Sequence, residues 1–198
     1  TDGAMFDNQG NLWVLNASSN LNNVHIMNPQ GEDLCSFNLY SNGNRIPFLT
    51  PGEIVVDKRN PQWKWFTLCR DNTGLILLQD NGTPTQSNDD KTLYRNEWFD
   101  QYNTPIRPEF IYTLVQDHDN TIWVGTSKGL FTIPASVDFM KSNKCERIVI
   151  RRNDGTDLGD YLLDGEPVNC IVVDGANRKW IGTAASGAFL IQITTDEV

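Results

Sequence analysis

Short apolar runs separated by polar turns recur along the whole chain. Residues 110–134 contain three such runs, "YTLVQD", "TIWVGT" and "GLFTI", which are rich in β-branched and aromatic residues and bounded by Gly, Asn and Asp. This pattern is typical of β-strands, and "ERIVIR" at 146–151 predicts a further strand. Because strands joined by tight turns pair antiparallel, the segment predicts one four-stranded antiparallel sheet.

The pattern occurs four times, each time with an Asp ahead of a Trp. The pairs are Asp7 and Trp13, Asp57 and Trp65, Asp117 and Trp123, and Asp174 and Trp180. In the second copy Trp63 is an alternative anchor, but Trp65 is preferred because "KWF" aligns with "KWI" at 179–181. In the last two copies a Gly follows the Trp by two positions, as Gly125 and Gly182.

A sheet repeated in this way predicts a β-propeller. The strands are apolar on both faces, as in "CIVV" at 170–173, so each sheet needs a neighbour on either side, which radial stacking provides. We therefore predict an all-β chain of about four four-stranded antiparallel blades, without a helix longer than two turns. The expected blades cover residues 1–45, 50–100, 108–152 and 165–193, and the last lacks its outer strand.

The repeated residues have structural explanations. The Asp closes the first strand and caps the following turn through its own backbone, and the Trp fills the space between adjacent blades. The Gly after the Trp lacks a Cβ and permits close approach of a neighbouring backbone or a bulge. These residues are therefore predicted to be structural anchors and not catalytic groups.

The segments "VQDHDNTIWVGTSKGLF" and "VVDGANRKWIGTAASGAF" resemble the two-component regulator propeller repeat of Bacteroidetes. Residues 160–183 are also similar to surface propeller proteins of the type IX secretion system in these bacteria. The resemblance implies a non-catalytic propeller in the periplasm or at the cell surface. It implies no single ligand, since members of the family differ in what they bind.

Composition and charge exclude several classes of protein. The net charge is −9 and no Lys/Arg cluster occurs, so no nucleic acid partner is expected. No stretch approaches the apolar length of a membrane helix, so no membrane insertion is predicted. The four cysteines (Cys35, Cys69, Cys145 and Cys170) have no CxxC spacing and are predicted to be unpaired thiols. The chain starts without Met inside a strand pattern, as expected of a segment of a longer protein.

Catalytic and metal-binding motifs are weak. His25 lies in a strand pattern and His118 in a turn, and neither is near a nucleophile motif. The acidic stretch 153–166 has carboxylate oxygens of the kind that bind calcium, but it lacks the order of ligands found in an EF-hand. A solvated loop is therefore the preferred interpretation. No cofactor and no metal are therefore predicted.

One region has the composition of a recognition surface. Residues 94–110 hold Trp98, Phe99, Tyr102 and Arg107 in a polar connection, and Trp63 is a further aromatic beside its anchor. Aromatic rings with Arg suit a sugar ring or a peptide. The alternative, preferred for Trp98 and Phe99, is that they lie on the outer strand of the second blade and pack against a neighbour.

The leading hypothesis is a non-enzymatic module that binds a glycan or protein partner, as the sensor region of a regulator or as a surface scaffold. The alternatives are a propeller-type polysaccharide lyase or hydrolase, which needs converging carboxylates, and a purely structural spacer. Because a four-blade arc exposes an apolar face at each end, two chains are predicted to associate as a homodimer that covers the end blades.

Overall fold

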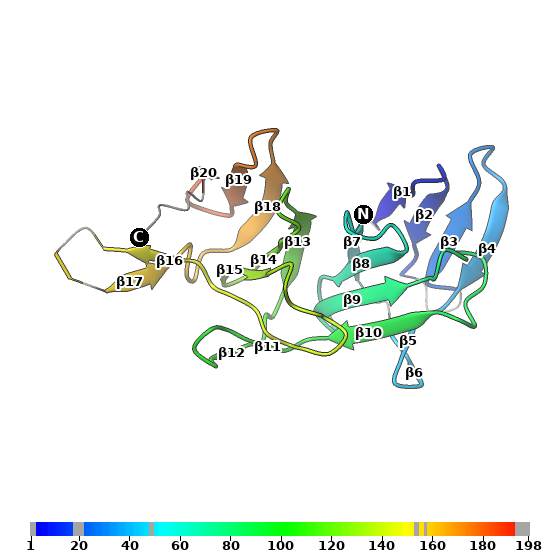
Figure 1. Cartoon of the computed structure of the whole chain (residues 1–198), viewed down its shortest axis with the longest axis horizontal. Helices are drawn as coiled ribbons and strands as arrows, with labels where there is room; N and C mark the ends of the chain where they lie inside the picture. The colour runs from blue at the N-terminus through cyan, green and yellow to red at the C-terminus, as the bar shows by residue number, and fades with distance from the viewer. Residues whose placement is uncertain (1–2, 18–21, 48–49, 153–154, 157, 193–198) are drawn as a thin grey trace.

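The structure is a computed structural model that describes residues 3–17, 22–47, 50–152, 155–156 and 158–192. Four antiparallel sheets follow one another in chain order (Figure 1). The first consists of β1 (Ala4–Phe6), β2 (Leu12–Leu15), β3 (Val24–Met27) and β4 (Asp33–Phe37). The second consists of β7 (Pro51–Val56), β8 (Trp63–Leu68), β9 (Gly74–Gln79) and β10 (Lys91–Arg95). The third consists of β13 (Ile111–Gln116), β14 (Ile122–Thr126) and β15 (Gly129–Ile133), and the fourth of β18 (Val168–Val173), β19 (Lys179–Thr183) and β20 (Ala188–Ile191).

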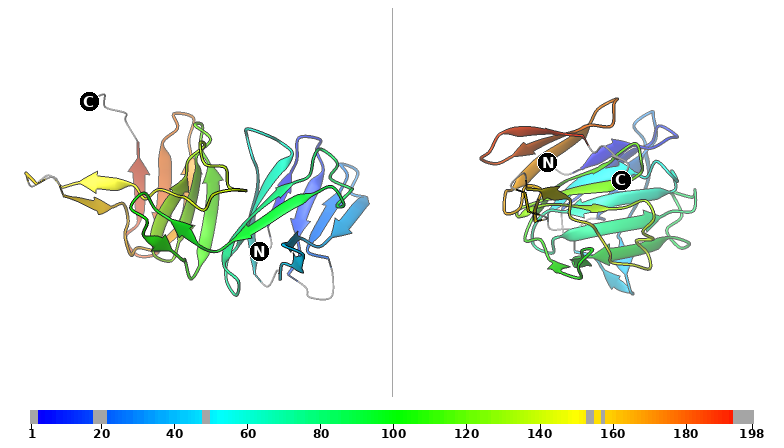
Figure 2. Two further views of the ribbon diagram at one scale, coloured as in Figure 1. Left: turned by 60° about the horizontal axis from the view of Figure 1, so that its bottom comes forward. Right: turned by 60° about the vertical axis from the view of Figure 1, so that its left-hand side comes forward.

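Three small hairpins connect or extend these sheets. They pair β5 (Tyr40–Ser41) with β6 (Asn44–Arg45), β11 (Trp98–Phe99) with β12 (Pro105–Ile106), and β16 (Val149–Arg151) with β17 (Gly159–Tyr161). The β16–β17 hairpin projects away from the stacked sheets (Figure 2). The described part of the chain contains no helix, and thus none that could cross a membrane. All four cysteines are free.

The prediction of a fourth strand in the third sheet is wrong. Its strand order is β13-β14-β15, and β16 pairs with β17 instead of β15. Only a single bridge remains at the expected place, where Thr132 and Glu146 exchange two backbone hydrogen bonds of 2.8 Å. The apolar run 148–151 that predicted the strand lies partly in solvent instead, since Ile150 is 50% exposed on the projecting hairpin.

Apolar side chains form one cluster between each pair of successive sheets. Trp13 belongs to the cluster between the first and second sheets, Trp65 to that between the second and third, and Trp123 to that between the third and fourth. These three indoles are at most 1% exposed. The prediction that both faces of an internal sheet are covered by its neighbours is therefore confirmed, as is Trp65 as the second anchor.

Trp180 departs from this pattern. Its side chain is 46% exposed, so the prediction that it fills a space between two sheets is wrong for the described chain. The reason is its place on the fourth sheet, at the end of the stack (Figure 1), where no further described sheet covers it.

The first strands of successive sheets lie side by side. β1 contacts β7, β7 contacts β13, and β13 contacts β18. The sheets thus converge along one edge, as radial stacking requires, and this inner edge carries the main groove described below.

Candidate functional site

In each of the four sheets the anchor Trp donates an indole hydrogen bond to the anchor Asp. The Nε1–Oδ2 distances are 2.9 Å for Trp13–Asp7, 3.0 Å for Trp65–Asp57, 2.9 Å for Trp123–Asp117 and 3.2 Å for Trp180–Asp174. The other oxygen caps the turn, as predicted: Asp117 Oδ1 accepts the backbone N–H groups of Asp119 and Thr121. Sequence analysis missed the bond to the Trp, although the recurring spacing of the pair was its signal.

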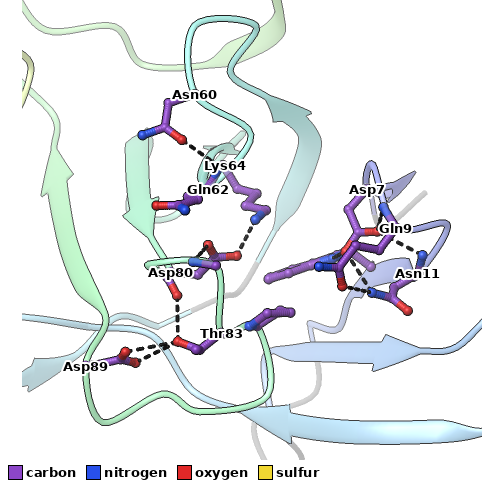
Figure 3. A network of polar contacts seen from close by, with 12 residues as sticks. Asp7, Gln9, Asn11, Asn60, Gln62, Lys64, Asp80, Thr83 and Asp89 are labelled. Atoms are coloured by element: carbon purple, nitrogen blue, oxygen red, sulfur yellow. Dashed lines mark hydrogen bonds and ion pairs between the residues drawn. The ribbon is translucent and has the colours of Figure 1, made fainter.

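Two lysines extend this motif from one sheet to the previous one. Lys179 precedes Trp180, and its Nζ lies 2.9 Å from Asp117 Oδ2 and 5.0 Å from the centre of the Trp123 ring. Lys64 precedes Trp65, lies 4.9 Å from the Trp13 ring centre and forms an ion pair with Asp80 (Figure 3). Both lysines are at most 3% exposed. These charges therefore belong to the contacts between sheets and are not available to a substrate.

Hydrogen bonds keep the anchor carboxylates ionised. Burial acts to raise the pKa of Asp117, but bonds from Lys179 and Trp123 lower it below its ordinary value of 3.8. Burial also acts on Asp174, yet bonds from Arg178 and Trp180 lower its pKa to about 2. A depressed carboxylate pKa contributes stability that is complete above the unfolded value and is lost as the pH falls through the folded value. The anchors therefore contribute in full at neutral pH.

Asp90 has the opposite shift. Its Oδ1 is buried without a hydrogen-bond partner among the described residues. Burial, with the charges of Asp80 and Asp89, raises its pKa to about 7, against the attraction of Lys64. The ionised form of Asp90 is thus disfavoured in the folded chain.

We predict that Asp90→Asn raises the melting temperature at pH 8, by about 2–4 °C. A raised carboxylate pKa costs stability as the pH climbs from the unfolded value of 3.8 to about 7, and the amide removes this cost. The gain should shrink in melts at pH 5, where most folded molecules already hold the proton. An equal gain at both pH values would contradict the titration of Asp90.

Gly125 confirms the predicted close approach between sheets. A Cβ at this position would lie 2.8 Å from the backbone oxygen of Val168 and 2.6 Å from Thr113 Cγ2. At Gly182 a Cβ would instead come close to a side chain, with the sulfur of Cys170 at 2.5 Å. The two glycines thus occupy the same repeat position but have different neighbours.

Gly125→Ala is expected to destabilise the chain by about 1–3 kcal/mol, as other overpacking substitutions do. Gly182→Ala should cost less, because the Cys170 side chain can move and a backbone oxygen cannot. Urea titrations of both variants measure the difference. Equal losses would mean that the backbone of Val168 does not limit the space at Gly125.

Trp98 and Phe99 lie on β11, against the third sheet. Trp98 is fully buried, with its ring centre 4.9 Å from that of Phe131, so it is a core residue whose ring is not accessible to a ligand. Trp98 therefore packs against a neighbour, as the preferred interpretation had it. It does so from a separate hairpin, however, and not from β10, the outer strand of the second sheet. Phe99 is half-buried, and Tyr102 in the following turn is 66% exposed.

The other two predicted ligand-binding residues lie in separate grooves. Arg107 pairs with Glu97 and borders a groove of about 320 Å³. Trp63 borders another of about 490 Å³, with the Arg59 guanidinium 5.6 Å from its ring centre. The structure thus does not bring the predicted residues together into one site.

A larger groove, of about 880 Å³, follows the inner edge of the first three sheets. Its walls come from β1, β7 and β13 and from the segments around Arg70 and Phe110. The groove is within the size range of small-molecule sites. We refer to it as the inner groove.

Three side chains form a stack on the wall of the inner groove. The rings of Phe110 and Tyr112 are stacked with centres 6.0 Å apart and planes at 19°, and the Arg70 guanidinium lies 5.2 Å from the Phe110 ring centre. Tyr112 is 36% exposed and Arg70 is exposed. We call these three residues the aromatic platform.

Local backbone structure holds the aromatic platform in place. The pairing of β13 with β14 shifts register between Ile111 and Thr113, around Tyr112, and such a bulge re-aims a side chain. From the second sheet, Glu53 accepts hydrogen bonds from the Leu114 N–H, at 2.5 Å, and from Thr113 Oγ1, at 3.1 Å. The strand beside Tyr112 is therefore fixed by the neighbouring sheet.

Sequence analysis missed the aromatic platform. Phe110 and Tyr112 alternate in "EFIYT", and side chains two apart on a strand share a face, so their pairing had a signal. Arg70 had none, because only the stacking of the second sheet on the third brings it to Phe110.

Catalytic and metal-binding arrangements are sparse. Among the described residues no group of three or more His, Cys, Asp or Glu side chains is placed to hold a metal. Asp154 and Asp157 of the acidic stretch lie outside the described residues. Asp160 of this stretch pairs with Arg152 and Asp164 with Arg147.

Comparison with known proteins finds one family model that matches part of the chain. Residues 105–128, which include Asp117 and Trp123, match the family model described as two component regulator propeller. This segment of the chain is thus similar to one such propeller repeat. No curated protein sequence is similar enough to match the chain. The matched segment thus contains β13 and β14 of the third sheet with their Asp–Trp anchor.

Solved structures with a similar fold extend the likeness beyond this one repeat. PorZ, an essential surface component of the type-IX secretion system of Porphyromonas gingivalis, is 27% identical over 96% of this chain, with a TM-score of 0.79. The extracellular domain of the putative one component system BT4673 from B. thetaiotaomicron is 16% identical over 98% of the chain, with a TM-score of 0.54, and shares the fold. The chain covers 25% of the first protein and 24% of the second, so it spans about a quarter of their length.

Proposed function

We propose that the chain is a non-enzymatic binding module of a larger propeller, which works in the periplasm or at the cell surface. The four sheets are four of its blades, near residues 1–45, 50–100, 108–152 and 165–193. It recognises a glycan or protein partner as part of a sensor or of a surface scaffold. The observation that carries the binding role is the exposed aromatic platform in the inner groove. The similarity to a secretion-system surface component and to an extracellular domain supports the compartment.

The arrangement of carboxylates favours binding over catalysis. A glycosidase needs two carboxyl groups that flank the scissile bond. Among the described residues that line the inner groove, Glu53 is the one carboxylate, and its oxygens already accept hydrogen bonds from Thr113 and Leu114. A polysaccharide lyase or hydrolase is therefore the less favoured alternative.

The experiment that tests this function has two parts. The chain is incubated with neutral and acidic polysaccharides while new reducing ends and unsaturated products are measured, and its binding to immobilised glycans and envelope proteins is measured by surface plasmon resonance. We expect binding without turnover. Turnover that disappears in Glu53→Gln would show that the chain is an enzyme. Absence of binding to every glycan and protein would contradict the proposed binding function.

A second copy of the chain is the proposed partner of the end sheets. The outer face of the fourth sheet exposes Val172, Trp180 and Leu190 by 60%, 46% and 43%, and Phe6 in the first sheet is 69% exposed. The two sheets lie at opposite ends of the stack (Figure 1), so one chain does not cover its own ends. Apolar surface of this kind favours association.

We predict a dimer mass by light scattering at micromolar concentration, and dissociation in Trp180→Glu, which puts a charge on the uncovered face. Val149→Glu, on the projecting hairpin, is the control and should leave the dimer intact. A monomer mass at all concentrations would contradict the homodimer.

A further inference from the structure

The aromatic platform combines an uncompensated cation with two aromatic faces. Among the described residues Arg70 has no carboxylate partner at ion-pair distance. Glu53, the carboxylate of the same groove, is engaged by Thr113 and Leu114. The guanidinium is therefore available to an anion from outside, although the chain as a whole carries a charge of −9.

The chemistry of the three side chains selects a ligand with two features. A guanidinium presents paired N–H donors that match a carboxylate or another planar pair of oxygens. Aromatic rings provide a flat apolar face that suits the C–H face of a sugar ring. A saccharide that carries an acidic group beside a ring face satisfies both.

The overall negative charge is compatible with such a ligand if the ligand is short. At physiological ionic strength charges more than about 8 Å apart are largely screened. The binding of a saccharide with one or two acidic groups is therefore governed by Arg70 at close range, whereas an extended polyanion would also meet the net negative charge of the rest of the chain. Nucleic acids are disfavoured for the same reason.

The platform also has the rigidity that recognition requires. The hydrogen bonds from Thr113 and Leu114 to Glu53 tie the strand that carries Tyr112 to the second sheet. Tyr112 is stacked on Phe110, and Phe110 lies under Arg70. A surface that is ordered before binding loses less entropy when the ligand arrives.

We propose that Arg70, Phe110 and Tyr112 form a subsite for an acidic saccharide, in which the guanidinium binds the acidic group and the rings stack on the sugar. This inference rests on the proposed binding function and names the ligand class of the inner groove.

The test is an array that presents uronate-containing, sulfated and sialylated oligosaccharides beside neutral oligosaccharides of matched backbone, probed with the labelled chain. We expect binding to acidic members only. Titration calorimetry with the best acidic member should give an affinity that falls as sodium chloride is raised. Arg70→Gln and Tyr112→Ala should each weaken it by about tenfold or more, as expected for the loss of a charged hydrogen bond or an aromatic contact.

Matched variants locate the site. Arg107→Gln and Tyr102→Ala change the same residue types outside the inner groove and should leave the affinity unchanged. Thermal melts of all four variants exclude unfolding as the cause of a loss. Loss in the Arg107 or Tyr102 variant with no loss in the Arg70 variant would move recognition to the region of residues 94–110 and overturn the subsite.

The remaining outcomes separate the inference from the proposed function. Equal binding of neutral and acidic members, unaffected by Arg70→Gln, would overturn the acidic subsite but leave a glycan-binding module. Binding to envelope proteins alone would overturn the subsite and leave a protein-binding module. Binding of inorganic sulfate with the affinity of the acidic saccharide would reduce the site to a simple anion site and overturn the role of the rings.

Discussion

Trp123→Ala is expected to lower the free energy of unfolding by about 3–5 kcal/mol, as for other fully buried aromatic residues. Trp123 is 1% exposed in the cluster between the third and fourth sheets, donates to Asp117 and lies under Lys179. Its removal leaves a cavity and takes a donor from a buried carboxylate. Guanidinium titrations monitored by circular dichroism measure the loss.

Trp180→Ala is the matched control for this substitution. Trp180 makes the same bond, to Asp174, but is 46% exposed, so less apolar surface returns to water and no closed cavity forms. We expect a loss well below that of Trp123→Ala. Similar losses for the two variants would mean that the fourth sheet is covered in solution, for example in the proposed homodimer. Dilution to concentrations below the dissociation constant of that dimer would then make the two losses of stability differ.

Asp117→Ala is expected to destabilise the chain by a comparable amount, about 3–5 kcal/mol, because removal of one partner leaves a buried charge unpaired. Asp117 is 3% exposed and Lys179 is 2% exposed, and the ion pair between them joins the third sheet to the fourth. The variant also loses the two backbone bonds that cap the turn after β13. Thermal and denaturant melts at pH 7 give the size of the effect.

Asp174→Ala is the control for the buried ion pair. Asp174 caps the corresponding turn of the fourth sheet and accepts the indole hydrogen bond of Trp180. Its ion pair, however, is with Arg178, whose side chain is 40% exposed. Removal of Asp174 should therefore destabilise the chain less than removal of Asp117, because a side-chain cap is lost but no buried charge is left unpaired. If Asp117→Ala cost no more than Asp174→Ala, the ion pair with Lys179 would add nothing to the contact between sheets.

Sequence reasoning failed where a segment left the regular repeat. The run "ERIVIR" has the composition of a strand, yet β16 pairs with β17 because local pairing in a hairpin competes with pairing to β15. Trp98 is buried against Phe131, as the preferred interpretation had it, but on the separate hairpin strand β11 and not on the outer strand of the second sheet. Composition states that a segment is extended or a ring is large, but not which neighbour it contacts.

The sequence by itself determined the all-β class, the recurring Asp–Trp–Gly pattern and the assignment of Trp65 as an anchor. The alternation of apolar and polar residues and the spacing of turn residues involve only a few neighbouring positions, so they can be recognised in the sequence alone. Only the tertiary structure decided that Lys64 and Lys179 cover the indoles of preceding sheets, that Trp180 is uncovered, and that Arg70 meets Phe110 and Tyr112. Those contacts join residues far apart in the chain, and they exist because each sheet must cover the apolar face of its neighbour.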